Sequence, residues 1–164
     1  MHGMTTEEFN KCVDAHSDSV YRFILKNIRD EEKARDIVQD TFEKLWVKAE
    51  GVAYEKARSY LFSAAYHTMI DVIRKEKKQK PLEEADYDQH SYHHAYQGLH
   101  EVLEQALKRL PEIQRSVLLL RDYEGYTYQE IGEIAGLSES QVKVYIYRAR
   151  LTMKKFIGSL EVVL

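Results

Sequence analysis

The stretch Thr127-Tyr-Gln-Glu-Ile-Gly-Glu-Ile-Ala-Gly-Leu-Ser-Glu-Ser-Gln141 contains two helix starts and the turn between them. Thr127 and Glu130 match the capping box S/T-x-x-E, and Ser138 and Gln141 match S/T-x-x-Q eleven residues later. Gly136, between the two boxes, can take the left-handed backbone conformation that ends a helix. A short capped helix, a glycine turn and a second capped helix predict a helix-turn-helix.

The second helix of this unit, residues 139–156, is the one expected to enter the major groove of DNA. Its regularly spaced apolar positions should face the core, which leaves the opposite flank exposed. Basic side chains there can bind phosphates or guanine, and apolar ones can contact thymine methyls. The predicted DNA-binding residues are Ser140, Gln141, Lys143, Val144, Tyr147 and Arg148. The alternative on these residues alone is an amphipathic surface helix of a small bundle.

In the N-terminal half, residues 34–46 carry a single apolar stripe, which predicts an amphipathic helix capped by Asp30. The stripe consists of Ala34, Ile37, Val38, Thr41, Phe42, Leu45 and Trp46. If Trp46 is buried as this spacing suggests, its replacement by alanine should cost about 3–5 kcal/mol. The polar side chains outside the stripe would form an ordinary solvated face by residue type alone: Arg35, Asp36, Gln39, Asp40 and Glu43.

The composition favours an all-α fold. Seven glycines and two prolines among 164 residues are too few turn residues for a chain of many short strands. Residues 81–98 are acidic, rich in His and Tyr, and show no helical period, which is typical of a flexible linker. We therefore expect two small helical domains, residues 4–80 and 99–164, each with its own core and with no motif that sets their mutual orientation.

Charge is unevenly distributed along the chain. The formal net charge is −3, and residues 81–100 contain four acidic and no basic residues. Basic clusters occur only at residues 74–80 and 143–155. Because phosphate neutralisation supplies most non-specific affinity for DNA, a chain with this balance should bind DNA weakly when alone.

Several other site types are not expected. No apolar run exceeds four residues, so no membrane span is predicted, and the single cysteine, Cys12, suits a reducing cytoplasm. His90, His93, His94 and His100 could suggest a metal site, but a solvated linker is the favoured interpretation. The sequence contains no catalytic constellation, so neither an enzyme nor a cofactor is predicted.

The ordered motifs resemble those of bacterial sigma factors of the extracytoplasmic-function (ECF) group. Residues 110–111, 117–121, 124–138, 142–143 and 148–150 resemble region 4 of that group. Residues 34–46 are similar to its region 2.2, and residues 59–62, 65 and 70–75 to its regions 2.3 to 2.4. The resemblance covers nearly the whole chain outside residues 81–98, in the family's order.

This resemblance implies a specificity subunit of RNA polymerase without a catalytic site of its own. The helix at residues 34–46 would dock on the beta-prime clamp helices through its exposed polar face. The helix-turn-helix would recognise minus-35 duplex, and the loop at residues 51–55 with the following helix would bind melted minus-10 DNA. The implied minus-10 residues are Tyr54, Tyr60, Tyr66, His67, Arg74 and Lys75. Tyr60 and Tyr66 could instead be core residues, and His67 stands where the family usually has asparagine.

The resemblance also implies a cytoplasmic protein with an anti-sigma factor as partner. Polymerase, anti-sigma factor and contact between the two domains are expected to use the same outward helix faces, at residues 34–46 and 138–155, and so to exclude one another. Two alternatives remain at this point. One is a free-standing helix-turn-helix regulator that binds duplex DNA as a dimer, and the other is a protein-interaction module without DNA contact.

Overall fold

The computed structural model describes residues 3–79 and 98–163, and these residues are helical with no strand among them. The all-α prediction is confirmed. The predicted linker, with His90, His93 and His94, lies outside the described residues apart from Gly98. Within the described part of the chain, no helix is long and apolar enough to cross a membrane.

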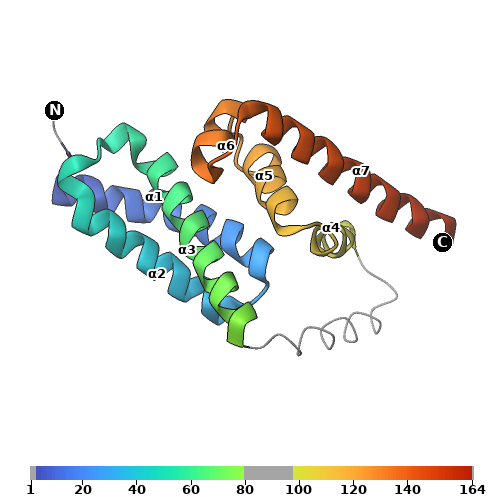
Figure 1. Cartoon of the computed structure of the whole chain (residues 1–164). Coiled ribbons are helices and arrows are strands. Elements are labelled where there is room, and N and C mark those ends of the chain that lie inside the picture. The colour runs from blue at the N-terminus through green and yellow to red at the C-terminus, as the bar shows by residue number, and fades with distance from the viewer. Residues whose placement is uncertain (1–2, 80–97, 164) are drawn as a thin grey trace.

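The N-terminal half is a bundle of three long helices, α1 (Thr6–Ile28), α2 (Glu31–Lys48) and α3 (Ala57–Gln79) (Figure 1). Two short 3-10 turns, Ala49–Gly51 and Tyr54–Lys56, connect α2 to α3. The predicted cap of α2 is present, because the Asp30 side chain accepts a hydrogen bond from the Lys33 backbone N–H.

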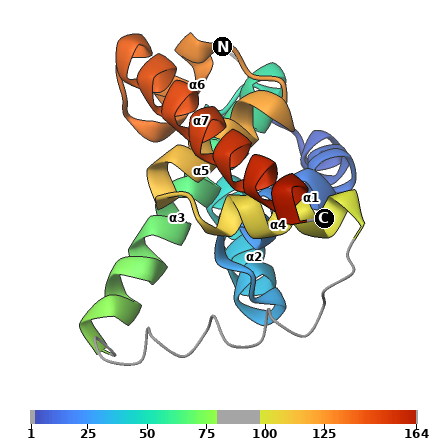
Figure 2. The ribbon, with the colours of Figure 1, turned by 90° about the vertical axis from the view of Figure 1, so that its right-hand side faces the viewer.

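The C-terminal half contains α4 (Leu99–Lys108), α5 (Glu112–Asp122), α6 (Tyr128–Ala135) and α7 (Glu139–Val163). Helix α7 continues beyond its predicted end at residue 156. It packs along α5, α6 and α4 and is the longest element of this half (Figure 2). The helix that carries the predicted DNA-binding residues is therefore supported along much of its length.

The two halves do not have separate cores, and this corrects the sequence-based expectation. Helix α6 packs on α3, and α4 and α5 pack on α1, so that the buried side chains form one contiguous cluster. Phe62 of α3 joins the halves: its ring centroid lies 5.5 Å from that of Phe23 and 5.6 Å from that of Tyr126. Local periodicity predicts which face of a helix is apolar, but it carries no information on which distant helix covers that face.

Trp46 is the clearest error in the predicted core. Ala34, Ile37, Thr41 and Leu45 are buried as expected, but Trp46 is 52% exposed. It lies at the edge of the stripe near the end of α2, where its ring contacts Phe9 of α1 in an edge-to-face arrangement with centroids 4.9 Å apart. Leu45, the preceding residue, is fully buried, so the core lies on the Leu45 side of α2 and the indole stays at its edge.

Trp46→Ala should therefore cost about 1–2 kcal/mol of unfolding free energy, well below the cost of a fully buried aromatic. Leu45→Ala is the matched control in the same turn, and as a fully buried residue it should cost about 2–5 kcal/mol. Urea denaturation followed by circular dichroism measures both. An equal or greater loss for Trp46→Ala would mean that the indole is enclosed after all.

Candidate functional site

The helix-turn-helix predicted at residues 127–141 is present with both capping boxes. Thr127 Oγ1 accepts a hydrogen bond from the Glu130 N–H at 3.1 Å, and Glu130 Oε1 accepts from the Thr127 N–H at 2.8 Å. Ser138 and Gln141 are paired in the same way, at 3.1 and 2.9 Å. Hydrogen bonds from Thr127 also lower the pKa of Glu130. Gly136 ends α6 with a φ of 73°, as predicted.

A second glycine in this turn has a role that the sequence analysis missed. A Cβ atom on Gly132 would lie 2.5 Å from the Leu137 carbonyl oxygen, far inside van der Waals contact. The Gly132 carbonyl in turn accepts a hydrogen bond from the Leu137 N–H at 2.9 Å. The chain leaving α6 therefore packs directly on the α6 backbone, which only a residue without a side chain allows.

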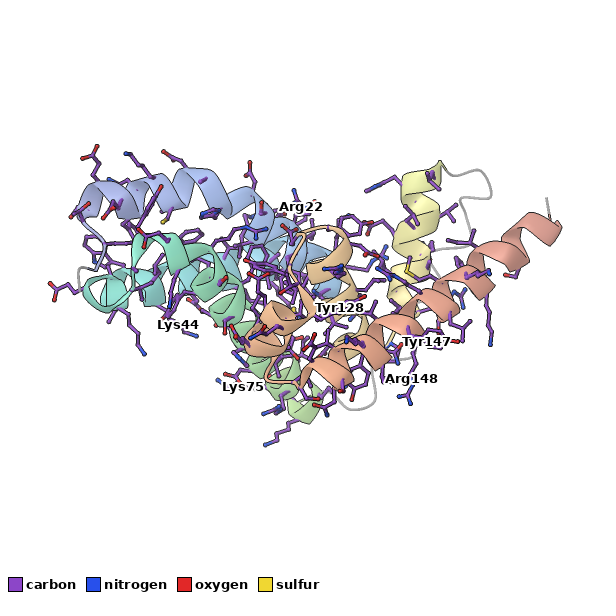
Figure 3. The ribbon with its side chains drawn as sticks, turned by 90° about the horizontal axis from the view of Figure 1, so that it is seen from above. Arg22, Lys44, Lys75, Tyr128, Tyr147 and Arg148 are labelled. Carbon is purple, nitrogen blue, oxygen red and sulfur yellow. The ribbon has the colours of Figure 1, made fainter. Side chains whose placement is uncertain are left out.

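Helix α7 presents its predicted DNA-binding side chains to solvent. Val142, Ile146 and Ala149 are buried against the core, and all six predicted residues lie on the exposed side of the helix. Tyr147 is 67% exposed and projects from α7 together with Arg148 (Figure 3). A shallow depression of about 210 Å³ is lined by Ser140, Gln141, Val144, Tyr145 and Arg148. Gln141 also has a structural role, because its carbonyl oxygen is engaged in the cap.

A cationic edge beside α7 was not predicted. The Tyr128 ring lies 4.6 Å from the Arg121 guanidinium and 5.8 Å from the Lys143 ammonium. Arg150 is paired with Asp122 at 2.6 Å. The sequence shows an aromatic residue, Tyr128, at the start of α6. Its partner Arg121 lies on α5, and the spacing of residues along one helix does not predict contacts with another helix.

The predicted minus-10 residues differ in exposure. Tyr54 is exposed in the loop between α2 and α3, Tyr60 is half-buried in the first turn of α3, and His67, Arg74 and Lys75 are exposed further along α3. Positions 60 and 74 of a helix are separated by about 21 Å along its axis. The predicted residues of α3 therefore follow this helix from its first turn to its basic end, where Lys75 is seen in Figure 3.

Tyr66 is the buried residue, and its assignment to DNA is wrong for this arrangement. It is 6% exposed, burial raises the pKa of its hydroxyl, and its ring edge meets the His67 ring at a centroid distance of 5.2 Å. A buried ring offers no free face on which a base can stack. Tyr66 is a core residue, which was the alternative left open by the sequence.

The predicted polymerase-binding residues share one exposed face of α2. Arg35, Asp36, Gln39, Asp40 and Glu43 are all exposed, and their spacing places them side by side on the helix surface. The Gln39 amide lies 3.5 Å from the Glu43 carboxylate. Behind this face, Lys44 donates a hydrogen bond to Thr68 at 2.6 Å and so links α2 to α3.

The contact between the two halves leaves both predicted binding faces open, which corrects another expectation. The polar face of α2 and the outer face of α7 stay exposed although the halves are packed together. The contact instead places α6 beside the loop before α3, of which Gly51, Tyr54, Glu55 and Lys56 remain exposed. A cleft of about 730 Å³ is lined on one side by this loop and the first turns of α3, and on the other by Glu130, Glu133 and Ile134 of α6.

Within residues 3–79 and 98–163, no group of three or more His, Cys, Asp or Glu is placed to hold a metal ion. His100, the described member of the histidine group, lies 3.8 Å from Glu104.

Comparison with known proteins gives the family. Residues 12–79 match the family described as "Sigma-70 region 2", and residues 100–153 match "Sigma-70, region 4". The chain is 32% identical over 145 residues to the RNA polymerase sigma factor YlaC of Bacillus subtilis, covering 83% of this chain and 84% of that protein. It is 29% identical over 157 residues to the ECF RNA polymerase sigma factor SigM of the same organism, covering 92% and 94%.

The fold is also shared with a solved structure. The sigma factor RpoE from Bartonella quintana, crystallised with the anti-sigma factor NepR, superposes with a TM-score of 0.77 at 20% identity, covering 93% of this chain and 98% of that one. The chain thus contains both sigma regions in the same order as the relatives. The match covers 84% and 94% of the two Bacillus proteins. The chain belongs to the sigma-70 family and is an RNA polymerase sigma factor of the ECF group.

Proposed function

We propose that residues 4–80 act as sigma region 2 and residues 99–164 as region 4, joined by residues 81–98. The chain binds core RNA polymerase and directs it to promoters, as a specificity subunit without a catalytic site of its own. One observation supports this proposal most strongly: the doubly capped helix-turn-helix, whose α7 buries Val142, Ile146 and Ala149 and exposes the opposite flank.

In this proposal α7 recognises the minus-35 duplex. Ser140 and Gln141 lie at its N-terminal end, where a recognition helix approaches base edges. Lys143 and Arg148 supply cations for phosphates or guanine, and Val144 and Tyr147 supply apolar contacts. The cationic edge at Tyr128 extends the surface that faces the DNA backbone.

The minus-10 element is bound as single-stranded DNA by the loop at residues 51–55 and by α3. Tyr54 and Tyr60 provide aromatic faces, and Arg74 and Lys75 provide cations at the far end of the helix. Stacking and cationic contacts are the two interactions that single strands use, since every base has a π-face and every phosphate a charge. Binding energy to the unstacked strand offsets the cost of opening the duplex, so no covalent step is needed.

Transcription in vitro with core polymerase tests this function. Addition of the chain should produce initiation at specific promoters, selected from genomic fragments of the source organism. The chain alone should bind the same duplexes weakly, in keeping with its net charge of −3. Tight binding of duplex DNA by the chain alone, without stimulation of the polymerase, would instead indicate a free-standing regulator.

Asp40→Lys should weaken binding to core polymerase at least about tenfold, because it reverses a charge at the centre of the exposed α2 face. Gln39→Ala should weaken it to a smaller degree. Both residues lie outside the apolar stripe, so the melting temperature should not change. Glu101→Lys on α4 makes the same charge change on an exposed residue of the other half. Equal affinities for Asp40→Lys and Glu101→Lys would contradict the docking assignment.

A protein partner is also proposed. The Bartonella relative is described in complex with an anti-sigma factor, and we infer that this chain is regulated by a protein of the same kind. Co-purification from the source cells, followed by mass spectrometry, tests this by separating core polymerase from a smaller inhibitor. Recovery of polymerase as the sole partner would contradict it.

A further inference from the structure

The short segment that precedes α1 is attached to the turn that follows α2. The Met4 backbone N–H donates a hydrogen bond to the Ala49 carbonyl at 2.7 Å, and the same carbonyl accepts from the Val52 N–H at 3.3 Å. We call residues 3–5 the anchor segment. It shares an acceptor with the Ala49–Gly51 turn, and the loop at residues 51–55 begins from this turn.

Gly3 lies directly on the backbone of the turn. A Cβ atom at position 3 would overlap the Glu50 carbonyl group and would lie 2.5 Å from the Ala49 carbonyl oxygen. Both obstacles are backbone atoms, which cannot move aside as the end of a flexible side chain can. Because only a residue without a side chain allows this approach, Gly3 sets the distance between the anchor segment and the turn.

Met4 and Thr5 hold the anchor segment from its other side. The Met4 side chain is 6% exposed, and its Sδ accepts a hydrogen bond from the Cys12 Sγ at 3.6 Å. Burial raises the pKa of the Cys12 thiol, so the thiol stays protonated and can donate. The Thr5 Oγ1 caps α1 by accepting from the Glu8 N–H at 3.1 Å. The segment is thus fixed to the core and to the start of α1 at the point where it contacts the turn.

This turn leads into the loop proposed to bind minus-10 DNA. Val52 and Ala53 follow the turn and line the cleft beside Tyr60. At the far end of the loop the Lys56 N–H donates to the Ala53 carbonyl at 2.9 Å, and the buried Ala57 begins α3. Since only a few residues connect two fixed points, the position of the turn decides where the loop backbone lies.

We propose that Gly3 and Met4 are positioning residues for minus-10 recognition, and that they act through the Ala49–Gly51 turn by holding the loop in the conformation that distinguishes one base from another. The inference rests on the proposed function of the loop. Neither residue needs to touch DNA, since Met4 is buried and Gly3 has no side chain. Selective binding requires groups held to within about 0.5 Å, and a displacement of about 1 Å can reduce a rate about a hundredfold.

Amide hydrogen exchange of the full chain, followed by nuclear magnetic resonance, tests the attachment. Gly3→Ala should displace the anchor segment from the turn and speed exchange of the Val52 amide at least about tenfold, because its acceptor is no longer held in place. Gly98→Ala is the matched control, since Gly98 also precedes a helix and no atom lies within 4 Å of a Cβ there. Unchanged exchange in Gly3→Ala would overturn the attachment.

Transcription by the holoenzyme tests the positioning role. Promoter templates that differ by single bases in the minus-10 element measure how strongly the polymerase prefers the best sequence. Gly3→Ala should lower this preference at least about fivefold. Its affinity for core polymerase should equal that of the parent, because the exposed face of α2 is unchanged. A preference equal to that of Gly98→Ala, or a loss of activity that is uniform over all templates, would overturn the proposal.

Variants of Met4 separate positioning from stability. Met4→Ala should lower the preference as Gly3→Ala does, and Met4→Leu, which keeps the buried volume, should restore most of it. Ile24→Ala, at a fully buried position of α1, should lower the free energy of unfolding at least as much as Met4→Ala and yet keep the preference. An equal loss of preference in Ile24→Ala would mean that the effect is one of stability alone and would overturn the positioning role.

The parent holoenzyme distinguishes failure of this inference from failure of the proposed function. If the parent selects no promoter, the proposed function fails, and the positioning role fails with it. If the parent selects promoters and Gly3→Ala selects them equally well, only the positioning role fails.

Discussion

Phe62→Ala is expected to lower the free energy of unfolding by about 3–5 kcal/mol, the range for removal of a fully buried aromatic ring. Phe62 has no exposed surface, and its ring packs edge-to-face against Phe23 of α1 and Tyr126 beyond α5. Truncation would therefore leave a cavity at the point where the two halves meet. Denaturant unfolding followed by circular dichroism measures the loss.

The matched control is Phe42→Ala, since Phe42 is a half-buried aromatic residue within the N-terminal bundle. It should cost clearly less than Phe62→Ala because part of its ring is already hydrated. If Phe62→Ala costs no more than Phe42→Ala, the contact between the halves contributes little and Phe62 is not enclosed from both sides.

Gly132→Ala is expected to lower the unfolding free energy by about 1–3 kcal/mol, although alanine is normally the better helix former. The added Cβ would lie 2.5 Å from the Leu137 carbonyl oxygen, which belongs to the backbone and not to the end of a flexible side chain. Relief requires the turn between α6 and α7 to open. The same variant should therefore lose most promoter-directed transcription, because α7 is repositioned relative to α6.

Gly158→Ala on α7 is the control for Gly132→Ala, since both glycines are helical but no atom lies within 4 Å of a Cβ at position 158. This substitution should stabilise the chain by up to about 1 kcal/mol through helix propensity alone. The change in unfolding free energy, measured by thermal and denaturant unfolding, should thus have opposite signs for the two variants. A stabilising effect of Gly132→Ala would show that the turn is looser than its geometry indicates.

The packing of the two halves engages several cations of the N-terminal half in ion pairs within the chain. Arg22, Lys26 and Arg58 give the N-terminal half cations that face the acidic Glu104 and Glu124 of the other half. These cations are engaged within the chain and are not available to DNA while the halves are packed. Exposed basic residues remain on α7 and at the end of α3, and also on α1 and α2, where Lys11, Arg35 and Lys48 are examples.

The sequence by itself determined the helical class, the helix-turn-helix and the two outward faces on α2 and α7. These features depend on interactions within a few residues: caps such as Thr127 with Glu130, the left-handed Gly136, and the spacing of apolar side chains along one helix. Such interactions can be read from neighbouring positions, and the structure contains each of them.

Only the tertiary structure decided which of these faces are covered and by what. Trp46 and Tyr66 have similar apolar spacing, yet one is exposed and the other buried, because burial depends on how neighbouring helices converge. The partners Arg58 and Glu124 are 66 positions apart, and Asn27 and Ser116 are 89 apart. No local pattern encodes such pairs, since packing brings them together only after each helix has formed.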